Sequence, residues 1–516
     1  MKFHFKGLNW GYLIYDFHKL IKYNDYLGLT CYVLPHKMKR QIVEINVNII
    51  CIEVNKSGVI MELLNRLKRY TKERPHQCAF RFDQDTLNYR ELYDRVVQIK
   101  QRITHIPKQS YVGLTLSHPM DTMIYYLALL MHECVPCLLD HRWSREQQDQ
   151  LIRHYGLSYL VDDTQRVQIN KGVTNQFTSD IEGLLHIGFT SGTTGLPKAY
   201  YRNEHSWIIS FEENEPLMSN PIETIVAPGP LSHSLSLYAC VYALYSGRTF
   251  EGQHHFNAQR LLHNIEHAQQ NVAMFLVPTM LAACTATNEE LTQTHHIFST
   301  GDKLHDHFRE RVRHTFPNSV LIEFFGTSEA SFISYNYDNQ APTHSVGKLF
   351  SNVEVKLSHQ VEHHIGLLQV CSDMVFSGYV DSESMHSLDW IETGDYASVD
   401  SNGYLFLHGR KHDRMIIGGR NVFPQEIERI AMTYPEIEEV VVMGVPHQRF
   451  GEIACMLYTA SETISKSTLR TYLSNRLARY QIPSKIIQVP RMNYTASGKI
   501  ARSEMKSLYL NGSYKS

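Results

Sequence analysis

The 516-residue sequence lacks an apolar run long enough to cross a bilayer, for which about 18 consecutive apolar residues are needed. It also lacks the charged start, short hydrophobic core and small-residue cleavage site of a secretory signal. Cysteine is sparse, with nine residues, an odd number that favours free thiols in a reducing compartment. We therefore expect a cytoplasmic protein without a transmembrane segment, and peripheral membrane contact stays open.

Charge bias and common metal-binding patterns are lacking as well. A formal net charge of −2 is far from the basic excess of nucleic-acid binders, so small-molecule partners are favoured. Cys134 and Cys137 form a single CxxC with no second pair at zinc spacing, which favours packed core thiols. The 29 histidines include no HExxH pattern and are interpreted as solvated or core residues.

The nucleotide loop written Gly, four residues, Gly-Lys-Ser/Thr does not occur, but another small-residue loop does. The stretch "FTSGTTGLPKA" at 189–199 follows an apolar run that predicts a buried strand, and Asn203 is a candidate helix cap. Glycines let backbone N–H groups face an anion, while hydroxyls and an ammonium add donors. These groups belong to Thr190, Ser191, Gly192, Thr193, Thr194, Gly195 and Lys198. The loop predicts a polyphosphate site, with an ordinary surface turn as the alternative.

Length and pattern divide the chain into parts. From residue 76 to 190 short apolar runs alternate with helical stretches, which predicts an α/β sheet, and the alternation continues beyond this range. Short β-like pieces dominate residues 344–410. We predict an N-terminal extension of residues 1–60, a large domain of residues 61–411 and a small α+β domain of residues 412–516. Our hypothesis is that the extension is upstream sequence, translated from a start assigned too early.

Three further segments carry groups that suit a phosphate site. Glu329 in "FFGTSEA" lies near the aromatic Phe325, and its carboxylate suits Mg²⁺ on a triphosphate. Asp395 in "WIETGDY" follows a glycine turn, where a carboxylate suits the hydroxyls of a ribose. Lys499 in "TASGKIARSEM" lies in a Ser-Gly turn from which a lysine can approach a reacting phosphate. Taken singly, each is also explained as an ordinary turn residue.

Taken in order, the segments resemble the motifs of the adenylate-forming superfamily, which includes acyl-CoA synthetases, luciferase-like enzymes and peptide-synthetase adenylation domains. The resemblance runs from about Leu87 to Met505 and is closest to fatty acid-CoA ligases. The matching segments are "FTSGTTGLPKA", "GPLSHSLSL", "FFGTSE", "ETGDY", "HGRKHDRMIIGGRNVFPQEIE" and "TASGKI". The resemblance implies an α/β fold: a large domain of layered sheets and helices with a small barrel-like subdomain, plus a small mobile α+β C-terminal domain.

The resemblance also implies a ligase that works in two steps. ATP and a carboxylic acid give an acyl-adenylate and pyrophosphate, and the thiol of coenzyme A then displaces AMP. Lys499 would bridge the attacking carboxylate and the phosphate, while the loop that ends at Lys198 would hold the β- and γ-phosphates. The other implied roles are Mg²⁺ binding by Glu329, α-phosphate contact by Ser328, ribose contact by Asp395, ribose or phosphate contact by Arg410, and adenine contact by Gly301 and Phe325.

Between the two steps, the resemblance implies that the C-terminal domain turns about a hinge at His412. Gly418 and Gly419 would then line the thiol tunnel, where the absence of side chains permits close approach. The family usually has Asp or Lys at the hinge position. Further departures from the family pattern are Ala199 and Thr300 where glycines are usual, and Ser328 where threonine is usual.

The residues at 232–234 indicate the kind of acid. Amino-acid-activating relatives carry an aspartate near this segment, whereas Ser232, His233 and Ser234 stand here, so an α-amino acid would bury an unpaired ammonium. His233 matches the histidine or aromatic that acyl- and aryl-CoA synthetases place by the substrate carboxylate. The following "LYACVYALYSG" is either core or the wall of an acyl pocket. We predict a medium- or long-chain fatty acid-CoA ligase. The alternatives are an aryl-CoA ligase, a stand-alone adenylating enzyme that loads a carrier protein, and a degenerate nucleotide-binding scaffold.

Overall fold

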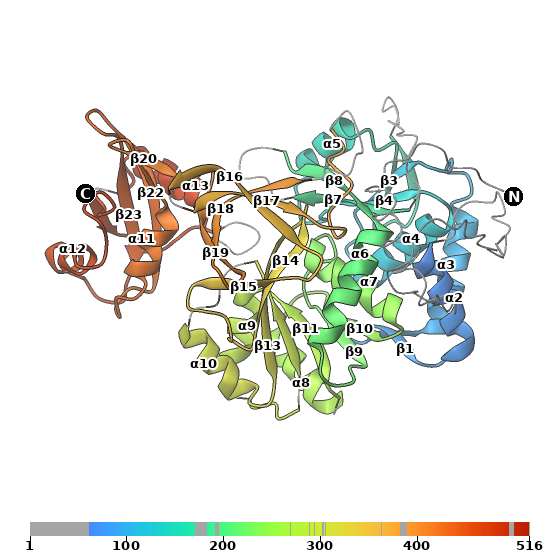
Figure 1. Cartoon of the computed structure of the whole chain (residues 1–516). Coiled ribbons are helices and arrows are strands. Elements are labelled where there is room, and N and C mark those ends of the chain that lie inside the picture. The colour runs from blue at the N-terminus through green and yellow to red at the C-terminus, as the bar shows by residue number, and fades with distance from the viewer. Residues whose placement is uncertain are drawn as a thin grey trace, which may run out of the picture. The chain divides into compact units, whose positions relative to one another are not determined.

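The computed structural model describes most of the chain from Met61 onward (Figure 1). The described residues are 61–170, 183–190, 196–268, 270–287, 289–293, 295–301, 304, 306–362, 364–381, 390–494 and 500–514. The predicted extension of residues 1–60 lies outside them, and its status stays a prediction. Every element named below belongs to one compact unit of residues 58–516.

One part of the largest sheet is a run of neighbouring parallel strands. Among the described residues this sheet has thirteen strands, in the order β16-β17-β18-β19-β15-β14-β13-β12-β11-β9-β10-β1-β2. The parallel members, in sheet order, are β13 (Val320–Thr327), β12 (His296–Ser299), β11 (Val272–Leu276), β9 (Thr224–Val226), β10 (Thr249–Gly252) and β1 (Cys78–Phe82). The antiparallel β2 (Asp85–Asn88) forms the edge.

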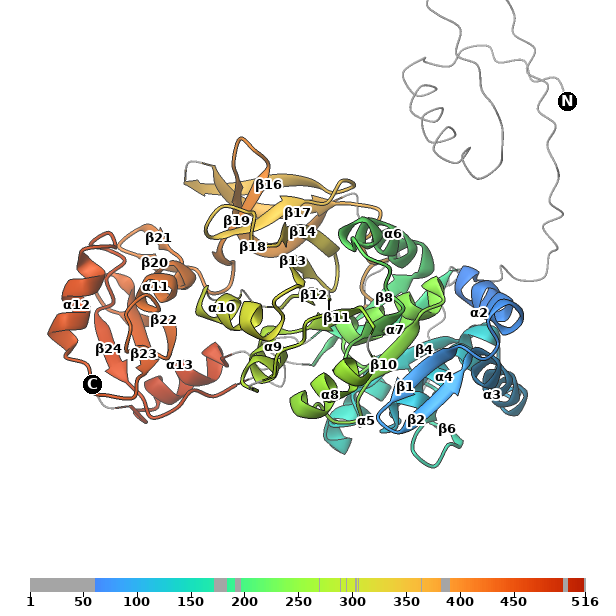
Figure 2. The same cartoon turned by 90° about the horizontal axis from the view of Figure 1, so that it is seen from below.

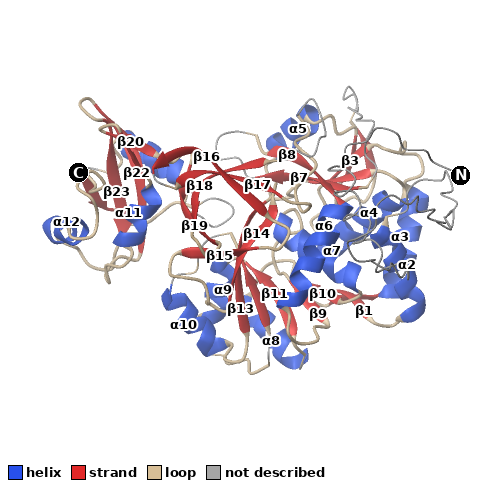
Figure 3. Cartoon of the chain, viewed as in Figure 1, coloured by secondary structure: helices blue, strands red, loops and turns tan. Residues whose placement is uncertain are grey.

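Helices cover both faces of these parallel strands (Figure 3). They are α2 (Glu62–Glu73), α3 (Tyr89–Arg102), α7 (Ser234–Ser246), α8 (Ala258–Ala268), α9 (Pro278–Thr285) and α10 (Asp306–Thr315). Successive side chains of a strand point to opposite faces. Along β11, Met274 and Leu276 therefore share a core with α8, α9 and α10, whereas Ala273 and Phe275 face the core that contains α7. Continuous apolar strands are buried on both sides in this way.

A second sheet carries the predicted phosphate loop. Its order among the described residues is β6-β5-β3-β4-β7-β8. The strands are β3 (Tyr111–Leu114), β4 (Val135–Leu138), β5 (Tyr159–Val161), β6 (Val167–Ile169), β7 (Leu184–Thr190) and β8 (Lys198–Asn203). The accompanying helices are α4 (Pro119–Met131), α5 (Arg145–His154), α6 (Glu204–Asn214) and the short 3₁₀ helix η2 (Glu215–Leu217). The almost wholly apolar α4 contacts β3 and β4 of this sheet and β1 of the other, so it packs between the two sheets (Figure 2).

Beyond β13 the largest sheet continues as antiparallel strands, and a smaller sheet follows towards the C-terminus. The continuing strands are β14 (Ser331–Tyr337), β15 (Ser345–Leu349), β16 (Glu354–Glu362), β17 (Ile365–Cys371), β18 (Ile391–Val399) and β19 (Tyr404–Arg410). The smaller sheet contains β20 (Met415–Ile417), β21 (Arg420–Val422), β22 (Glu439–His447), β23 (Gly451–Thr459) and β24 (Lys485–Gln488), with α11 (Pro424–Ala431), α12 (Lys466–Ser474) and α13 (Arg502–Leu510). The predicted mixed α/β fold with a smaller C-terminal domain is confirmed, while the boundary residues and the domain's mobility stay predictions.

The cysteines behave as core residues. Cys134 and Cys137 are buried, and burial raises the pKa of the Cys134 thiol to about 11, so this thiol stays protonated at neutral pH. The described cysteines are all free of disulfides. None of the helices in the described ranges is long and apolar enough to span a membrane. The cytoplasmic location stays a prediction.

Candidate functional site

The predicted phosphate loop lies between two antiparallel strands. β7 ends at Thr190 and β8 begins at Lys198, and these two residues are partners in the strand register. Ser191, Gly192, Thr193, Thr194 and Gly195 lie outside the described residues, so their phosphate contacts stay predictions. The structure adds a strand, β8, between this loop and the expected helix. Asn203 caps that helix, α6, by accepting a hydrogen bond of 2.7 Å from the Ser206 N–H, as the sequence predicted.

Tyr379 links the two charged residues predicted to face the phosphates and Mg²⁺. Its hydroxyl donates a hydrogen bond of 2.7 Å to Oε1 of Glu329, and its ring centroid lies 5.4 Å from Nζ of Lys198. Burial and the nearby Glu329 charge raise the pKa of Tyr379, so the phenol is a neutral donor. The backbone fixes the arrangement, since Phe376 N–H donates to the Glu329 carbonyl and Tyr379 pairs with Tyr200 of β8. The structure therefore brings Lys198 and Glu329 to one place.

Arg202 holds the backbone at the predicted α-phosphate residue. Its guanidinium is buried and donates to the carbonyl oxygens of Ser328 and Met374, the latter at 2.9 Å. Burial lowers the pKa of Arg202 to about 10, which still leaves the side chain charged at neutral pH. A buried guanidinium with fixed acceptors is a rigid support. It fixes the turn that leads from Ser328 into Glu329.

The predicted ribose residues form an ion pair across two strands. Asp395 on β18 and Arg410 on β19 are register partners, and Arg410 Nε lies 2.8 Å from Asp395 Oδ1. The Asp395 side chain is 7 % exposed and that of Arg410 is 51 % exposed. The Thr393 hydroxyl also accepts a hydrogen bond of 3.1 Å from the Asp395 N–H. The structure thus brings together two residues that were assigned to the ribose region on separate motifs.

The predicted adenine residues follow neighbouring parallel strands. β12 and β13 pair Ser299 with Glu323, so Gly301 and Phe325 each lie two residues further along their chains, at the carboxyl ends of these strands. Ligands of α/β folds commonly bind at this edge. Gly301 has a φ of +100°, and a Cβ there would meet only Val277 Cγ1 at 3.8 Å. The backbone angle alone thus favours glycine.

His233 lies in a polar cluster at the start of α7. Its Nε2 is 3.1 Å from Arg142 Nη2 and 3.5 Å from Asp140 Oδ2, and the imidazole is 42 % exposed. Asp140 is buried, and Arg142 Nε donates to its Oδ1 at 2.9 Å. Burial by itself would raise the pKa of Asp140, but the hydrogen bonds from Arg142 and His233 hold it well below its usual range. The structure therefore places a permanently charged ion pair beside the predicted acid-binding residue.

The predicted hinge and tunnel residues lie in exposed turns, and the predicted catalytic lysine is not described. His412 lies in the turn between β19 and β20. Gly418 and Gly419, with φ of +58° and +80°, connect β20 to β21 as a two-residue hairpin. Positive φ at both central residues is what a type I′ turn requires, so this turn explains the glycines without reference to a ligand. Lys499 lies outside the described residues.

Four residues beside these sites were not predicted from the sequence: Arg202, Tyr379, Asp140 and Arg142. Each of them, or its ion-pair partner, contacts a predicted site residue that lies far from it in the sequence. The sequence carries one usable signal, because a charged residue such as Arg202 inside the otherwise buried strand "AYYR" needs a specific partner. For Tyr379 and the Asp140–Arg142 pair we find no such signal.

Comparison with known proteins identifies the family of the chain. The family described as AMP-binding enzyme matches residues 67–186 and 175–380, and the AMP-binding enzyme C-terminal domain matches residues 426–499. The chain is 45% identical over 461 residues to a Staphylococcus haemolyticus protein that carries the provisional name long chain fatty acid-CoA ligase VraA. That alignment covers 88% of this chain and 100% of the relative.

Two further comparisons are more distant. A 2-succinylbenzoate–CoA ligase of Staphylococcus epidermidis is 26% identical over 473 residues, which are 86% of this chain and 98% of that protein. A solved structure of o-succinylbenzoate coenzyme A synthetase (MenE) from Bacillus subtilis, in complex with ATP and magnesium ion, shares the fold with a TM-score of 0.74. At 20% identity it covers 86% of this chain and 99% of that one. Because the family matches span more than half of the chain, the chain belongs to the AMP-binding enzymes, the adenylate-forming superfamily that its motifs resemble.

Proposed function

We propose that the chain is an ATP-dependent fatty acid-CoA ligase that activates a medium- or long-chain acid as acyl-AMP and transfers the acyl group to coenzyme A. Family membership and acyl-CoA ligase relatives make it an AMP-forming acid-thiol ligase. The fatty acid is proposed from the name of the 45% identical relative. The structural observation that carries the proposal is the meeting of Lys198, Tyr379 and Glu329 at the end of the predicted phosphate loop.

In the first step an oxygen of the substrate carboxylate attacks the α-phosphorus of ATP. A new P–O bond forms, the bond from the α-phosphorus to the bridging oxygen breaks, and pyrophosphate leaves with the electron pair. Because a carboxylate and a triphosphate repel each other, fixed positive charges and donors must offset this repulsion. We assign this role to Lys198 and Thr190 at the β- and γ-phosphates, and to Lys499 and Ser328 at the reacting centre.

Glu329 fits the Mg²⁺ that such a reaction uses. Mg²⁺ in nucleotide sites is usually held by one or two carboxylates together with phosphate oxygens and water. The Tyr379 hydrogen bond to Oε1 orients the Glu329 carboxylate, and Arg202 fixes the backbone before it. When bound, the ion neutralises phosphate charge. The work of the protein's own residues is to hold the carboxylate in this orientation.

Asp395 and Arg410 are proposed to orient the nucleotide. The buried Asp395 carboxylate can accept from both ribose hydroxyls, while the half-exposed guanidinium of Arg410 pairs with that carboxylate. Gly301 and Phe325 at the neighbouring strand ends are proposed to border the adenine. This placement would hold the α-phosphate in one orientation for the attack.

In the second step the sulfur of coenzyme A attacks the acyl carbon. A C–S bond forms, the C–O bond to AMP breaks, AMP leaves with the electron pair, and the thiol proton passes to solvent. We propose that the C-terminal domain turns about His412 between the steps, which withdraws Lys499 and brings Gly418 and Gly419 to the pantetheine arm. The exposed turn positions of these three described residues are compatible with that role, although the type I′ turn also explains the two glycines.

The polar cluster at His233 supports a substrate without an amino group. A carboxylate does lie near this position, but Arg142 already neutralises Asp140 through hydrogen bonds of 2.5 and 2.9 Å. An α-amino acid would therefore find no unpaired carboxylate in this cluster for its ammonium. We propose that His233, held by this ion pair, faces the substrate carboxylate. Helix α7 then presents an apolar, buried body behind it.

One assay separates the proposal from its alternatives. Pyrophosphate release is followed after mixing the full chain with ATP, Mg²⁺ and a panel of fatty, aryl and amino acids, with and without coenzyme A. The proposal expects sustained release with medium- or long-chain fatty acids when coenzyme A is present. Preference for aryl acids would favour the aryl-CoA ligase. If pyrophosphate release stops after one turnover even when coenzyme A is present, a carrier-protein acceptor is favoured. If no acid gives any release, a scaffold is favoured.

A further inference from the structure

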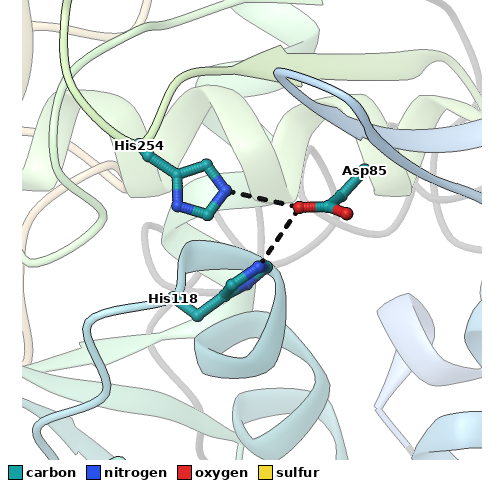
Figure 4. A group of neighbouring side chains, drawn as sticks. All are labelled: Asp85, His118 and His254. Carbon is teal, nitrogen blue, oxygen red and sulfur yellow. Dashed lines mark hydrogen bonds and ion pairs between the residues drawn. The ribbon is translucent and has the colours of Figure 1, made fainter.

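Away from the residues assigned above, two histidines and one aspartate from three distant segments meet (Figure 4). Asp85 opens β2, His118 precedes α4, and His254 lies between β10 and α8. Figure 4 shows both imidazole rings turned towards the carboxylate of Asp85. One ligand atom from each residue lies within 4.8 Å of the other two. Imidazole and carboxylate are the ligand types that zinc and related divalent ions accept.

The spacing of the ligand atoms suits one small cation. Oδ2 of Asp85 lies 3.3 Å from Nε2 of His118 and 3.6 Å from Nε2 of His254. Ligand bonds of about 2.0–2.1 Å in a tetrahedral arrangement place neighbouring donor atoms roughly 3.3–3.4 Å apart. Both distances to Asp85 are thus close to the separation that a shared tetrahedral ion imposes, and the two imidazole ligand atoms lie within 4.8 Å of each other.

Hydrogen bonds alone explain the arrangement less well. The contact from His118 to Asp85 is a long hydrogen bond, and the 3.6 Å contact from His254 is beyond hydrogen-bond range. The two rings meet edge to face, with centroids 4.4 Å apart and planes at 86°. In Figure 4 both dashed contacts, one from Nε2 of each ring, end on the same oxygen of Asp85. Nδ1 of His118 is buried with no hydrogen-bond partner among the described residues, which leaves Nε2 as its accessible nitrogen.

Neighbouring contacts hold the ligand-bearing segments in place without the ion. The Asp83 carboxylate, in the turn before Asp85, accepts a hydrogen bond of 3.0 Å from the His254 N–H. The other oxygen of Asp83 pairs with Arg260 of α8 at 2.9 Å. The side chains of Asp85, His118 and His254 are 54 %, 36 % and 28 % exposed, so solvent can supply an entry path and a fourth, water ligand.

We propose that Asp85, His118 and His254 form a site for a divalent transition-metal ion, with Zn²⁺ as its best-fitting occupant. The ion would tie the β1–β2 turn to the start of α4 and to the segment between β10 and α8. These segments are far apart in sequence, so binding would stabilise the folded large domain. None of the three residues belongs to the nucleotide or acid site proposed above, and the inference does not depend on that function.

The test uses the full chain without an affinity tag, stripped of metal with a chelator and then titrated with Zn²⁺ against a chromophoric competitor. We expect the wild-type protein to bind one Zn²⁺ more than His254→Ala or Asp85→Asn, or to bind it at least tenfold more tightly. Zn²⁺ should also raise the thermal midpoint of the wild-type protein and leave that of both variants unchanged. Equal stoichiometry, affinity and thermal response in all three proteins would overturn the site.

The many histidines of this chain require matched controls. His255→Ala removes an exposed neighbour of His254 that lies outside the cluster, and it should bind Zn²⁺ like the wild type. His263 and His267 lie one helical turn apart on α8, with ring centroids 3.9 Å apart, and form a competing pair. If the tight site disappears in the double variant His263→Ala/His267→Ala and persists in His254→Ala, the proposal is wrong. Far-ultraviolet circular dichroism of each variant confirms that the fold is kept.

Discussion

The Tyr379 hydroxyl donates a hydrogen bond of 2.7 Å to the Glu329 carboxylate, while the Tyr379 ring lies 5.4 Å from the Lys198 ammonium. One phenol therefore contacts the proposed metal ligand and the proposed phosphate-binding cation. Its segment is held there by backbone pairing with β8, which places Val380 N–H on the Ala199 carbonyl at 3.0 Å. The relative placement of the two charged groups is thus a property of the folded backbone, set before ATP binds.

Tyr379→Phe should weaken the first step while leaving the fold intact. The substitution keeps the ring but removes the donor to a charged acceptor, an interaction worth about 1.5 kcal/mol, or roughly tenfold in kcat/KM for ATP. The rate of pyrophosphate release at a series of ATP concentrations gives this kcat/KM. Tyr472→Phe removes a hydroxyl that hydrogen-bonds Thr433 in the C-terminal domain, and it should leave this rate unchanged. Equal effects of the two variants would remove Tyr379 from the site.

Asp395→Asn should raise the KM for ATP by about tenfold or more, because the ribose hydroxyls lose a charged acceptor. The neighbouring pair of Glu392 and Lys411, 2.8 Å apart and exposed, supplies the control. Glu392→Gln removes a similar ion pair from the same two chain segments and should leave the KM unchanged, since exposed pairs contribute little. A KM that responds equally to both variants would contradict the ribose assignment.

Folding stability should fall with acidification through a buried histidine. Burial, with a further effect of the Arg202 charge, lowers the pKa of His186 from 6.5 to about 3. The unfolded chain therefore binds a proton below pH 6.5 that the folded protein excludes until about pH 3. Through this group the free energy of unfolding decreases as the pH falls through this window, and the decrease is about 2 kcal/mol at pH 5. Above the window this group has no effect on stability.

His186→Gln should flatten this pH dependence, because glutamine can still bond the Tyr126 hydroxyl, which lies 3.2 Å from His186 Nδ1, and does not titrate. Denaturant unfolding at pH 7 and pH 5 gives the difference in unfolding free energy. The exposed His255→Gln is the control and should keep the wild-type slope. A wild-type slope in His186→Gln would show that other groups cause the loss.

Lys499→Ala should separate the two steps. Formation of the acyl-adenylate should fall by about a hundredfold, the usual effect of removing one preorganised donor at developing charge. Thioester formation from a preformed acyl-adenylate should be retained, because the proposal withdraws Lys499 before that step. Lys466→Ala, in an exposed position at the start of α12, should leave both steps unchanged. An equal loss of rate in both steps would contradict the proposal that Lys499 acts only in the first step.

The alternation of apolar runs and helical stretches was sufficient to predict the α/β class, because strands such as β11 are apolar on both faces. The order of the strands could not be predicted from the sequence, because it depends on pairings between distant segments, such as β1 with β10. The strand β8 was missed for a related reason. Its hydrogen bonds come from β7 and from residues 377–380, and its own sequence, "KAYYRN", has charged or polar ends.

The motifs were sufficient to name both members of two pairs that the structure brings together, Asp395 with Arg410 and Lys198 with Glu329. Residues that hold these side chains in place lie outside the motifs, because their partners are set by tertiary contacts. Arg202 on Ser328 and Arg142 on Asp140 are examples. The histidine pattern of the sequence predicts solvated or core residues and gives no signal for the grouping of His118 and His254 around Asp85, because the three residues come from separate segments of the fold.

The most direct test of the proposed chemistry follows the oxygen atoms of the acid. The protein is incubated with ATP, Mg²⁺, coenzyme A and a long-chain fatty acid that carries heavy oxygen in both positions of its carboxylate. The masses of the products are then measured by mass spectrometry. If the carboxylate attacks the α-phosphorus, AMP acquires one labelled oxygen and acyl-CoA keeps the other. Label in inorganic phosphate, or unlabelled AMP formed alongside acyl-CoA, would contradict the account.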